Sequence, residues 1–179
     1  MLAEDILEIT TNVVKEFENL QEWQINKKTS NVSWSIGQCL HHLIVSNGKY
    51  IPILNSIASG KHTMTFWEKY NPLSSYTGQK MIKTLGPDII KKYKSPLIFT
   101  PSEKHFSLRL LEDFKEQQNQ LYKLFVELEK EKYSSMRLTS PVAGLITLPV
   151  HDAIKIIIAH EKRHLKQALA VKEGGLFSQ

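Results

Sequence analysis

Apolar residues recur every three or four positions through most of this chain of 179 residues, a spacing that lines one face of an α-helix. The first stripe predicts a helix that runs to about Trp23, and its members are Leu2, Ile6, Ile9, Val13, Phe17 and Leu20. A second helix is expected after Ser35, because this residue is a good N-cap and Gln38 completes a capping box. Its apolar pattern continues to Ser59-Gly60 but includes Pro52, which predicts a kink or an interruption.

The segment from Lys61 to Thr100 lacks this periodicity and contains several prolines and glycines. We expect a crossover connection there, with a short helical turn around Gln79 to Leu85. Its aromatic side chains are expected to cover one end of the protein or to wall a pocket, and they are Phe66, Trp67, Tyr70, Tyr76, Tyr93 and Phe99.

Two further helices are predicted in the second half of the chain. Residues 100–103, Thr-Pro-Ser-Glu, are a typical helix start, and the third helix is expected to run from there to about Lys132. The apolar run from Val142 to Leu148 is interpreted as loop rather than strand. The fourth helix is expected from about Val150 to Lys172 and closes on Gly174-Gly175.

Four long helices with one long crossover predict an all-α protein, a four-helix bundle that forms a single domain over residues 1–179. Hydrophobic residues make up 41% and charged residues 23%, as in an ordinary globular protein. The net charge of +5 comes from lysines interleaved with acids along predicted helix faces, which favours a solvated surface over nucleic-acid binding.

The single cysteine, Cys39, excludes an intramolecular disulfide and a cysteine-based zinc site, and we expect it to be a packed core thiol. The N-terminal stretch lacks the basic start and unbroken apolar run of a secretory signal. No segment approaches the length of a membrane span, so a cytoplasmic protein without a membrane partner is expected.

Residues 160–164 read HEKRH, a literal match to the H-E-x-x-H signature of helical zinc proteases. On a helix, His160 and His164 lie on one flank of the apolar arc, where two imidazoles can converge on one ion. Glu161 falls near the middle of the apolar arc, where a carboxylate must be paired or hydrogen-bonded. It is interpreted as a general base, as a group that orients a metal ligand, or as a buried acid bonded to another helix.

A zinc protease of this kind takes its third ligand from downstream of the second histidine. Here Gln167 and Ala170 stand where an extended motif has glycine and histidine, and the zinc-protease interpretation therefore lacks a ligand. The ligand is expected upstream, and the remaining histidines are His41, His42, His62, His105 and His151. The adjacent pair His41 and His42 lies in mid-helix, but periodicity barely separates these two residues.

At these positions the chain resembles the DinB/YfiT-like superfamily of small metal-binding proteins. That family has a Trp-Ser helix start, an acid or amide three residues after the serine, a His-Leu pair one turn later, and H-x-x-x-H near the C-terminus. The matching residues are Trp34-Ser35, Gln38, His42-Leu43, His160 and His164. Gln38 replaces the family's usual glutamate, and the spacing from Trp34 indicates His42 rather than His41.

The resemblance implies an up-down-down-up four-helix bundle with the crossover between the second and third helices. It also implies a divalent ion, most commonly zinc or nickel, that is held by His42, His160 and His164 with solvent in the open positions. Three neutral imidazoles leave the ion its double charge and an exchangeable position, which is typical of catalytic sites. Such an ion lowers the pKa of bound water toward about 7, or binds a thiol as thiolate.

Two interpretations of function stay open. The first is a metal-dependent thiol S-transferase or hydrolase that acts on a small molecule, and the resemblance adds low-molecular-weight thiols such as bacillithiol or mycothiol as substrates. In that case Glu161 is the candidate catalytic base, while Tyr50 and Ser46 are expected to line the pocket. The second is a non-catalytic module of the same fold that binds metal or forms a homodimer. No nucleic-acid partner is expected under either interpretation.

Overall fold

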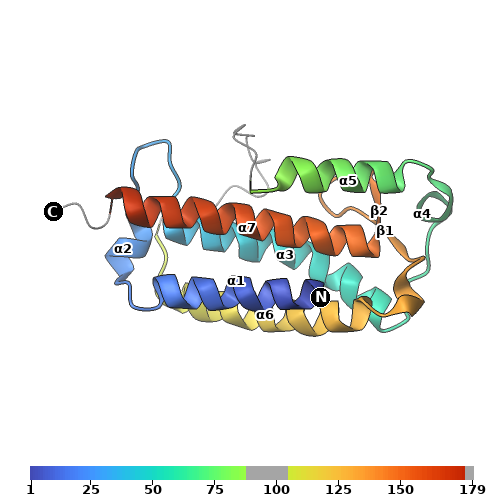
Figure 1. Cartoon of the computed structure of the whole chain (residues 1–179), viewed down its shortest axis with the longest axis horizontal. Coiled ribbons are helices and arrows are strands. Elements are labelled where there is room, and N and C mark those ends of the chain that lie inside the picture. The colour runs from blue at the N-terminus through green and yellow to red at the C-terminus, as the bar shows by residue number, and fades with distance from the viewer. Residues whose placement is uncertain (88–104, 176–179) are drawn as a thin grey trace.

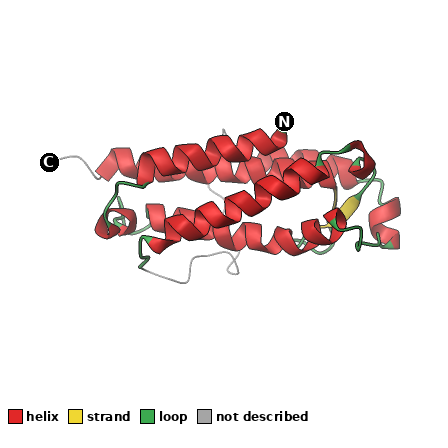
Figure 2. Ribbon diagram, turned by 90° about the horizontal axis from the view of Figure 1, so that it is seen from below, coloured by secondary structure: helices red, strands yellow, loops and turns green. Residues whose placement is uncertain are grey.

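Four long helices dominate the computed structural model, which describes residues 1–87 and 105–175 (Figure 1). They are α1 (Leu2–Phe17), α3 (Ile36–Ala58), α6 (Arg109–Leu128) and α7 (Val150–Gly175). All four lie along the long axis of the molecule, and α1 and α3 each pack against both α6 and α7. Figure 2 shows how little of the described chain is strand, and the all-α class predicted from the sequence is confirmed.

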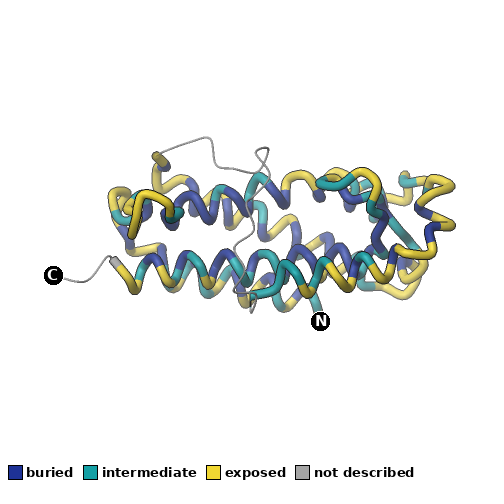
Figure 3. Tube along the Cα trace, turned by 90° about the horizontal axis from the view of Figure 1, so that it is seen from above, coloured by how far each residue is buried: buried dark blue, intermediate teal, exposed yellow. Residues whose placement is uncertain are grey.

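The core lies between the four long helices, whose inward faces are buried and outward faces exposed (Figure 3). It is built from large side chains that are almost completely excluded from solvent, among them Phe17, Leu43, Phe114, Leu121 and Phe125. The 3.6-residue period places these residues on single stripes, so each helix has one face that stabilises the fold only when packed. Within the described residues, none of the helices is both long and apolar enough to cross a lipid bilayer.

The first helix is shorter than the stripe predicted. α1 ends at Phe17, and the chain turns before a short helix, α2 (Glu22–Asn26), that contains Trp23. The N–H of Gln21 donates to Oε1 of Gln24 at 2.7 Å, which begins this new helix with its own cap. The apolar stripe thus continues across a break, because Leu20 and Ile25 both remain buried in the core.

The predicted capping box of α3 is confirmed. The N–H of Gln38 donates to Oγ of Ser35 at 3.1 Å, and Oε1 of Gln38 accepts from the N–H of Ser35 at 3.2 Å. The helix then runs through Pro52 without interruption. Pro52 and Gly48 both lie on the exposed face, so the Gly48 carbonyl that loses its helical donor can bond to solvent.

The crossover is more helical than expected. It contains α4 (Phe66–Tyr70) and the twelve-residue helix α5 (Ser74–Leu85), which packs on α7. Gly78 allows this close approach, since a Cβ there would lie 2.6 Å from Oδ2 of Asp152 on α7. Of the predicted aromatic set, Phe66, Trp67, Tyr70 and Tyr76 are exposed on α4 and α5, while Tyr93 and Phe99 lie outside the described residues.

The loop predicted for residues 142–148 is correct for residues 142–146, but its last two residues belong to a small antiparallel hairpin. β1 (Arg137–Thr139) pairs with β2 (Thr147–Pro149), so that Leu138 lies opposite Leu148 and both are fully buried. Strands of three residues are too short to show an alternating pattern, and their partner is identified only by the tertiary fold. A 3₁₀ turn (Glu131–Tyr133) precedes the hairpin.

The predicted start of the third helix at residues 100–103 lies outside the described residues. α6 begins at Arg109 and ends at Leu128, a turn before the predicted end at Lys132. Phe106 precedes the helix and is bonded instead to Asn26, which donates to its carbonyl at 2.7 Å and accepts from its N–H at 2.8 Å. The fourth helix, α7, starts at Val150 as predicted.

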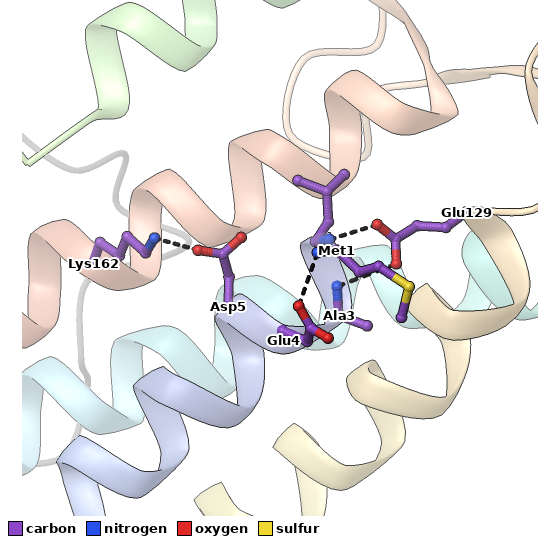
Figure 4. A network of polar contacts seen from close by, with 7 residues as sticks. Met1, Ala3, Glu4, Asp5, Glu129 and Lys162 are labelled. Carbon is purple, nitrogen blue, oxygen red and sulfur yellow. Dashed lines mark hydrogen bonds and ion pairs between the residues drawn. The ribbon is translucent and has the colours of Figure 1, made fainter.

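The N-terminal part of α1 is held by Glu129, which directly follows α6, and by Lys162 of α7 (Figure 4). The carboxylate of Glu129 accepts from the N–H groups of Leu2 at 2.5 Å and Ala3 at 3.3 Å. These are N–H groups of the first helical turn, which have no partner inside the helix and favour a negative charge. Lys162 of α7 also pairs with Asp5 of α1, and the two contacts fix α1 against α6 and α7.

Candidate metal centre

Three histidines from two helices converge inside the protein. His42 lies on α3, two turns after its capped start, and His160 and His164 lie one turn apart on α7. Nε2 of His42 is 3.1 Å from Nε2 of His160, and all three residues offer ring nitrogens within 4.8 Å of one another. His42 and His164 are buried, and His160 is half-buried. The fold therefore brings together the three residues that the resemblance indicated.

The spacing of these nitrogens fits a divalent ion. Imidazole nitrogens bind zinc at about 2.0–2.1 Å, so two of them on one ion lie roughly 2.8–3.4 Å apart, between the octahedral and the tetrahedral angle. The 3.1 Å between His42 and His160 falls in that range. Nδ1 of His164 is buried and has no hydrogen-bond partner within the described residues. Buried polar atoms are rarely left unpaired, so this nitrogen is able to take a further partner.

The environment keeps the two histidines of α7 in the form that binds metals. Burial lowers the pKa of His160 to about 3, with His42 and Arg163 adding smaller repulsive effects. Burial also lowers the pKa of His164 to about 2, assisted by the neighbouring His160 and His42. Both imidazoles are therefore neutral at pH 7, and neutral imidazole is the ligand form of histidine.

Trp34 closes one side of the cluster. Its indole stacks on the ring of His164, with centroids 5.6 Å apart and planes 16° from parallel, and it lies tilted 5.0 Å from the ring of His42. Trp34 immediately precedes the N-cap Ser35, so the capping box that starts α3 also positions the indole. From the sequence alone, Trp34 was identified only as part of the Trp-Ser motif, and no contact was assigned to it. Its fixed spacing from His42 in that motif was the feature that could have indicated one.

His41 does not belong to the cluster. Its ring packs 5.0 Å from the ring of Phe106 and is half-buried, on a different face of α3 from His42. The remaining candidates are also engaged elsewhere. Nε2 of His62 lies 3.2 Å from the carbonyl of Arg137, and His105 is exposed and lies beside Glu22. His151 contacts the carbonyl of Leu128 at 3.0 Å.

Of the three interpretations of Glu161 that the sequence left open, the structure supports a buried acid that is hydrogen-bonded to other helices. It is fully buried, and its Oε1 accepts from Nδ2 of Asn47 on α3 at 2.5 Å and from Nε2 of Gln118 on α6 at 2.7 Å. Its Oε2 has no hydrogen-bond partner within the described residues. Burial raises the pKa of Glu161 to about 7, although the two amide donors oppose the shift. Among described residues, neither oxygen hydrogen-bonds to a clustered histidine, so its role as a base stays a prediction.

The sequence interpretation missed Asn47 and Gln118. Both occupy positions where the helical period calls for an apolar residue: Asn47 lies four residues from Leu43 and from Ile51, and Gln118 lies between Phe114 and Leu121. Both side chains are buried, at about 1% exposure. A polar residue inside an apolar stripe was the available signal, because a buried amide needs a polar partner.

Three other predicted residues have local roles. Oγ of Ser46 bonds to the carbonyl of His42 on its own helix, and the hydroxyl of Tyr50 lies 3.5 Å from Oγ of Ser140. The role of Ser46 and Tyr50 in lining a pocket stays a prediction. Cys39 is completely buried, and burial raises the pKa of its thiol to about 12. It is the packed core thiol that was expected.

These observations define a class of helical protein in which three histidines from two helices are gathered inside the fold at a point suited to a divalent ion. Comparison with protein families then identifies the family. The chain belongs to the DinB superfamily, whose model matches residues 7–168. Comparisons with curated proteins and with solved structures returned no match. The predicted resemblance is confirmed.

Proposed function

We propose that this protein is a metal-dependent enzyme in which His42, His160 and His164 hold one zinc or nickel ion. The observation that carries the proposal is the convergence of ring nitrogens from three histidines on two helices, all within 4.8 Å of one another, with those of His42 and His160 3.1 Å apart. Membership of the DinB superfamily supports the same assignment.

Three protein ligands leave at least one coordination position for a reactant, which is the arrangement of catalytic zinc. When bound, such an ion supplies Lewis-acid chemistry and lowers the pKa of a water or thiol that it coordinates. The protein's own contribution is to present neutral imidazoles and to exclude bulk water with Trp34. We therefore propose hydrolysis of a small molecule, or transfer of a low-molecular-weight thiol to an electrophile.

The architecture that carries this site is proposed to be a single-domain, up-down-down-up four-helix bundle. The mutual packing of α1, α3, α6 and α7 supports it, as does the position of α4 and α5 between α3 and α6 in the chain. In this arrangement α3 and α7 are neighbours, which is required if His42 is to meet His160 and His164.

Metal content tests the proposal directly. Purified protein reconstituted with zinc or nickel is expected to retain about one equivalent after gel filtration, measured by elemental analysis. His42→Ala is expected to lose most of the metal. His41→Ala is the matched control, because it removes the adjacent imidazole that faces Phe106, and it should retain the wild-type amount. Failure of the wild-type protein to retain metal would overturn the proposal.

The depth of the cluster favours a second candidate, a module in which the ion only stabilises the fold. His42 is 4% exposed and His164 is 8% exposed, which restricts access for a substrate. The metallated protein should be assayed with several thiols plus an electrophile, and with activated esters. Turnover that is lost in His164→Ala supports the enzyme. Absence of turnover with full metal binding favours the module, and light scattering then determines whether it is a dimer.

A further inference from the structure

Glu161, the glutamate of HEKRH, belongs to a cluster of buried polar side chains inside the apolar core, which we call the polar hub. This hub consists of Glu161, Asn47 and Gln118, and each residue comes from a different helix. All three are 0–1% exposed. Removing a carboxyl and two amides from water costs free energy that only partly returns through hydrogen bonds, so apolar residues would pack here at least as well. The hub therefore needs a purpose other than stability.

On both helices that carry the clustered histidines, α3 and α7, a hub residue lies close to a histidine in sequence. Glu161 is flanked by His160 and His164 on α7, and Asn47 lies five residues after His42 on α3. The Asn47–Glu161 bond of 2.5 Å consequently joins the same two helices as the 3.1 Å approach of His42 to His160. The Gln118–Glu161 hydrogen bond of 2.7 Å joins a third helix, α6, to α7.

Two hydrogen bonds from different helices to one oxygen restrict the rotation and sliding of α7. Apolar contacts are non-directional and tolerate small rotations, whereas hydrogen bonds weaken steeply when their angle changes. A metal site requires its ligands to be held within about 0.5 Å and 10–20°. Rotation of α7 moves His160 and His164 together relative to His42, so the site depends on fixing that rotation.

We propose that Glu161 is a positioning residue which, through Asn47 and Gln118, fixes α7 so that His160 and His164 face His42. It acts through the histidines and not on a substrate. The effect on metal affinity rests on the proposed function, while the effect on the arrangement of the three imidazoles does not. A positioning role needs only an acceptor oxygen at Oε1, whereas a general base needs a carboxylate that can take up a proton. The two roles can therefore be separated by substitution.

Two substitutions at position 161 separate the roles. Glu161→Gln keeps an acceptor oxygen for Asn47 and Gln118 but cannot serve as a base. It is expected to bind zinc within about threefold of wild type and to give the same cobalt absorption spectrum. Glu161→Leu removes the acceptor and is expected to weaken zinc binding by about 10- to 100-fold, the usual effect of losing a group that orients metal ligands. Affinity is measured by competition with a chromophoric chelator.

Glu161→Leu leaves two buried amides without an acceptor, so a second variant guards against simple loss of folding. The triple variant Asn47→Leu, Gln118→Leu, Glu161→Leu removes the whole hub and leaves no orphaned donor. We expect it to fold with an unfolding temperature similar to or above that of wild type, yet to bind zinc as weakly as Glu161→Leu. Asn71→Ala is the matched control. It removes a buried hydrogen bond from the side-chain amide of Asn71 to the hydroxyl of Thr147, and Asn71 is far from the histidines in sequence.

The metal-free protein provides the readout that is independent of the proposed function. Long-range proton–nitrogen NMR spectra report the ring nitrogens of His42, His160 and His164. Their signals should be unchanged in Glu161→Gln and shifted or broadened in Glu161→Leu and the triple variant. If all these variants give wild-type imidazole signals, the positioning proposal is overturned whether or not the protein binds metal. A loss of affinity in Glu161→Gln equal to that in Glu161→Leu also overturns it, because the acceptor would then not be the essential feature.

Discussion

At the scale of single residues, Trp34 contacts two of the three clustered histidines. Its indole lies parallel to the ring of His164 and tilted against that of His42, and the side chain as a whole is half-buried. A stacked aromatic ring restricts rotation of the imidazole and covers it from water. Trp34 should therefore slow both the movement of these ligands and the access of competing molecules.

Trp34→Ala is expected to leave zinc binding detectable but to speed the release of zinc by about tenfold, since groups that orient metal ligands typically matter at that level. Trp34→Phe keeps a ring at this position and should recover much of the difference. Release is followed by stopped-flow mixing of the zinc protein with an excess of a coloured chelator. Trp23→Ala, on α2 and 54% exposed, is the control. Equal release rates in Trp34→Ala and wild type would contradict the role of the indole.

At the scale of elements, α4 is too short to be stable alone and depends on its attachment to the hairpin. Glu68 makes this attachment, although it is only 2% exposed. Its carboxylate accepts from the N–H of Thr65 at 2.8 Å, which caps α4, and from the N–H and hydroxyl of Thr139 at 2.6 and 2.9 Å. His62 lies 3.5 Å away. One buried side chain thus joins the helix cap, the strand β1 and the start of the crossover.

The attachment predicts a pH dependence. Burial alone would raise the pKa of Glu68, but the hydrogen bonds from Thr65 and Thr139 and the nearby His62 outweigh it and hold the pKa below 4.5. A depressed pKa means that the ionised carboxylate stabilises the fold above pH 4.5, and that this stabilisation is lost as pH falls through the lower folded-state pKa. Glu68→Gln should cost about 1–3 kcal/mol in urea unfolding at pH 7.

The same measurement below pH 4.5 supplies the check. The difference in unfolding free energy between wild type and Glu68→Gln should shrink as the pH is lowered through this range, because wild-type Glu68 itself becomes protonated. Glu8→Gln on the exposed face of α1 is the control, and we expect a change within about 0.5 kcal/mol at either pH. A difference that stays constant with pH would show that the charge of Glu68 does not stabilise the attachment.

Elements also show what could be predicted from the sequence. Local signals were sufficient where the structure is local: the Ser35–Gln38 capping box and the start of α7 at Val150 are as predicted. Interactions between distant segments were not predictable in the same way. Neither strand of the hairpin has a pattern of its own, and α6 starts after Phe106 because Asn26 holds that residue outside the helix.

The candidate site divides along the same line. The spacing of His160 and His164 is a property of one helix and was readable directly. The choice of His42 over His41 required the family resemblance, because helical periodicity left both near the margin of the apolar arc. The partners of Glu161 lie 43 and 114 residues away, and only the fold brings them together.

At the scale of the whole molecule, the five residues of HEKRH connect α7 to the other helices in four directions. His160 approaches His42 on α3, and Glu161 bonds to α3 and α6. Lys162 pairs with Asp5 on α1, as Figure 4 shows, and Nη1 of Arg163 lies 3.3 Å from the carbonyl of Thr84 on α5. The motif is therefore a point where the helices meet, and a ligand bound there should raise the free energy of unfolding of the whole protein.

Zinc or nickel should accordingly stabilise the protein as a whole. The three histidines are close together only in the folded chain, since His42 and His160 are 118 residues apart in sequence. An ion that binds the folded state alone stabilises it by about 2.7 kcal/mol when its free concentration is 100 times the dissociation constant. For a domain of this length that corresponds to an increase of roughly 5–10 °C in the unfolding temperature.

The increase is measured by differential scanning calorimetry with and without a slight excess of metal buffered by a weak chelator. His42→Ala should unfold at nearly the same temperature in both conditions, because two histidines on one helix are a weaker site that the unfolded chain can partly mimic. His151→Ala, which removes an imidazole from α7 outside the cluster, should keep the full increase. An equal increase in all three proteins would place the ion elsewhere on the molecule and separate the cluster from metal binding.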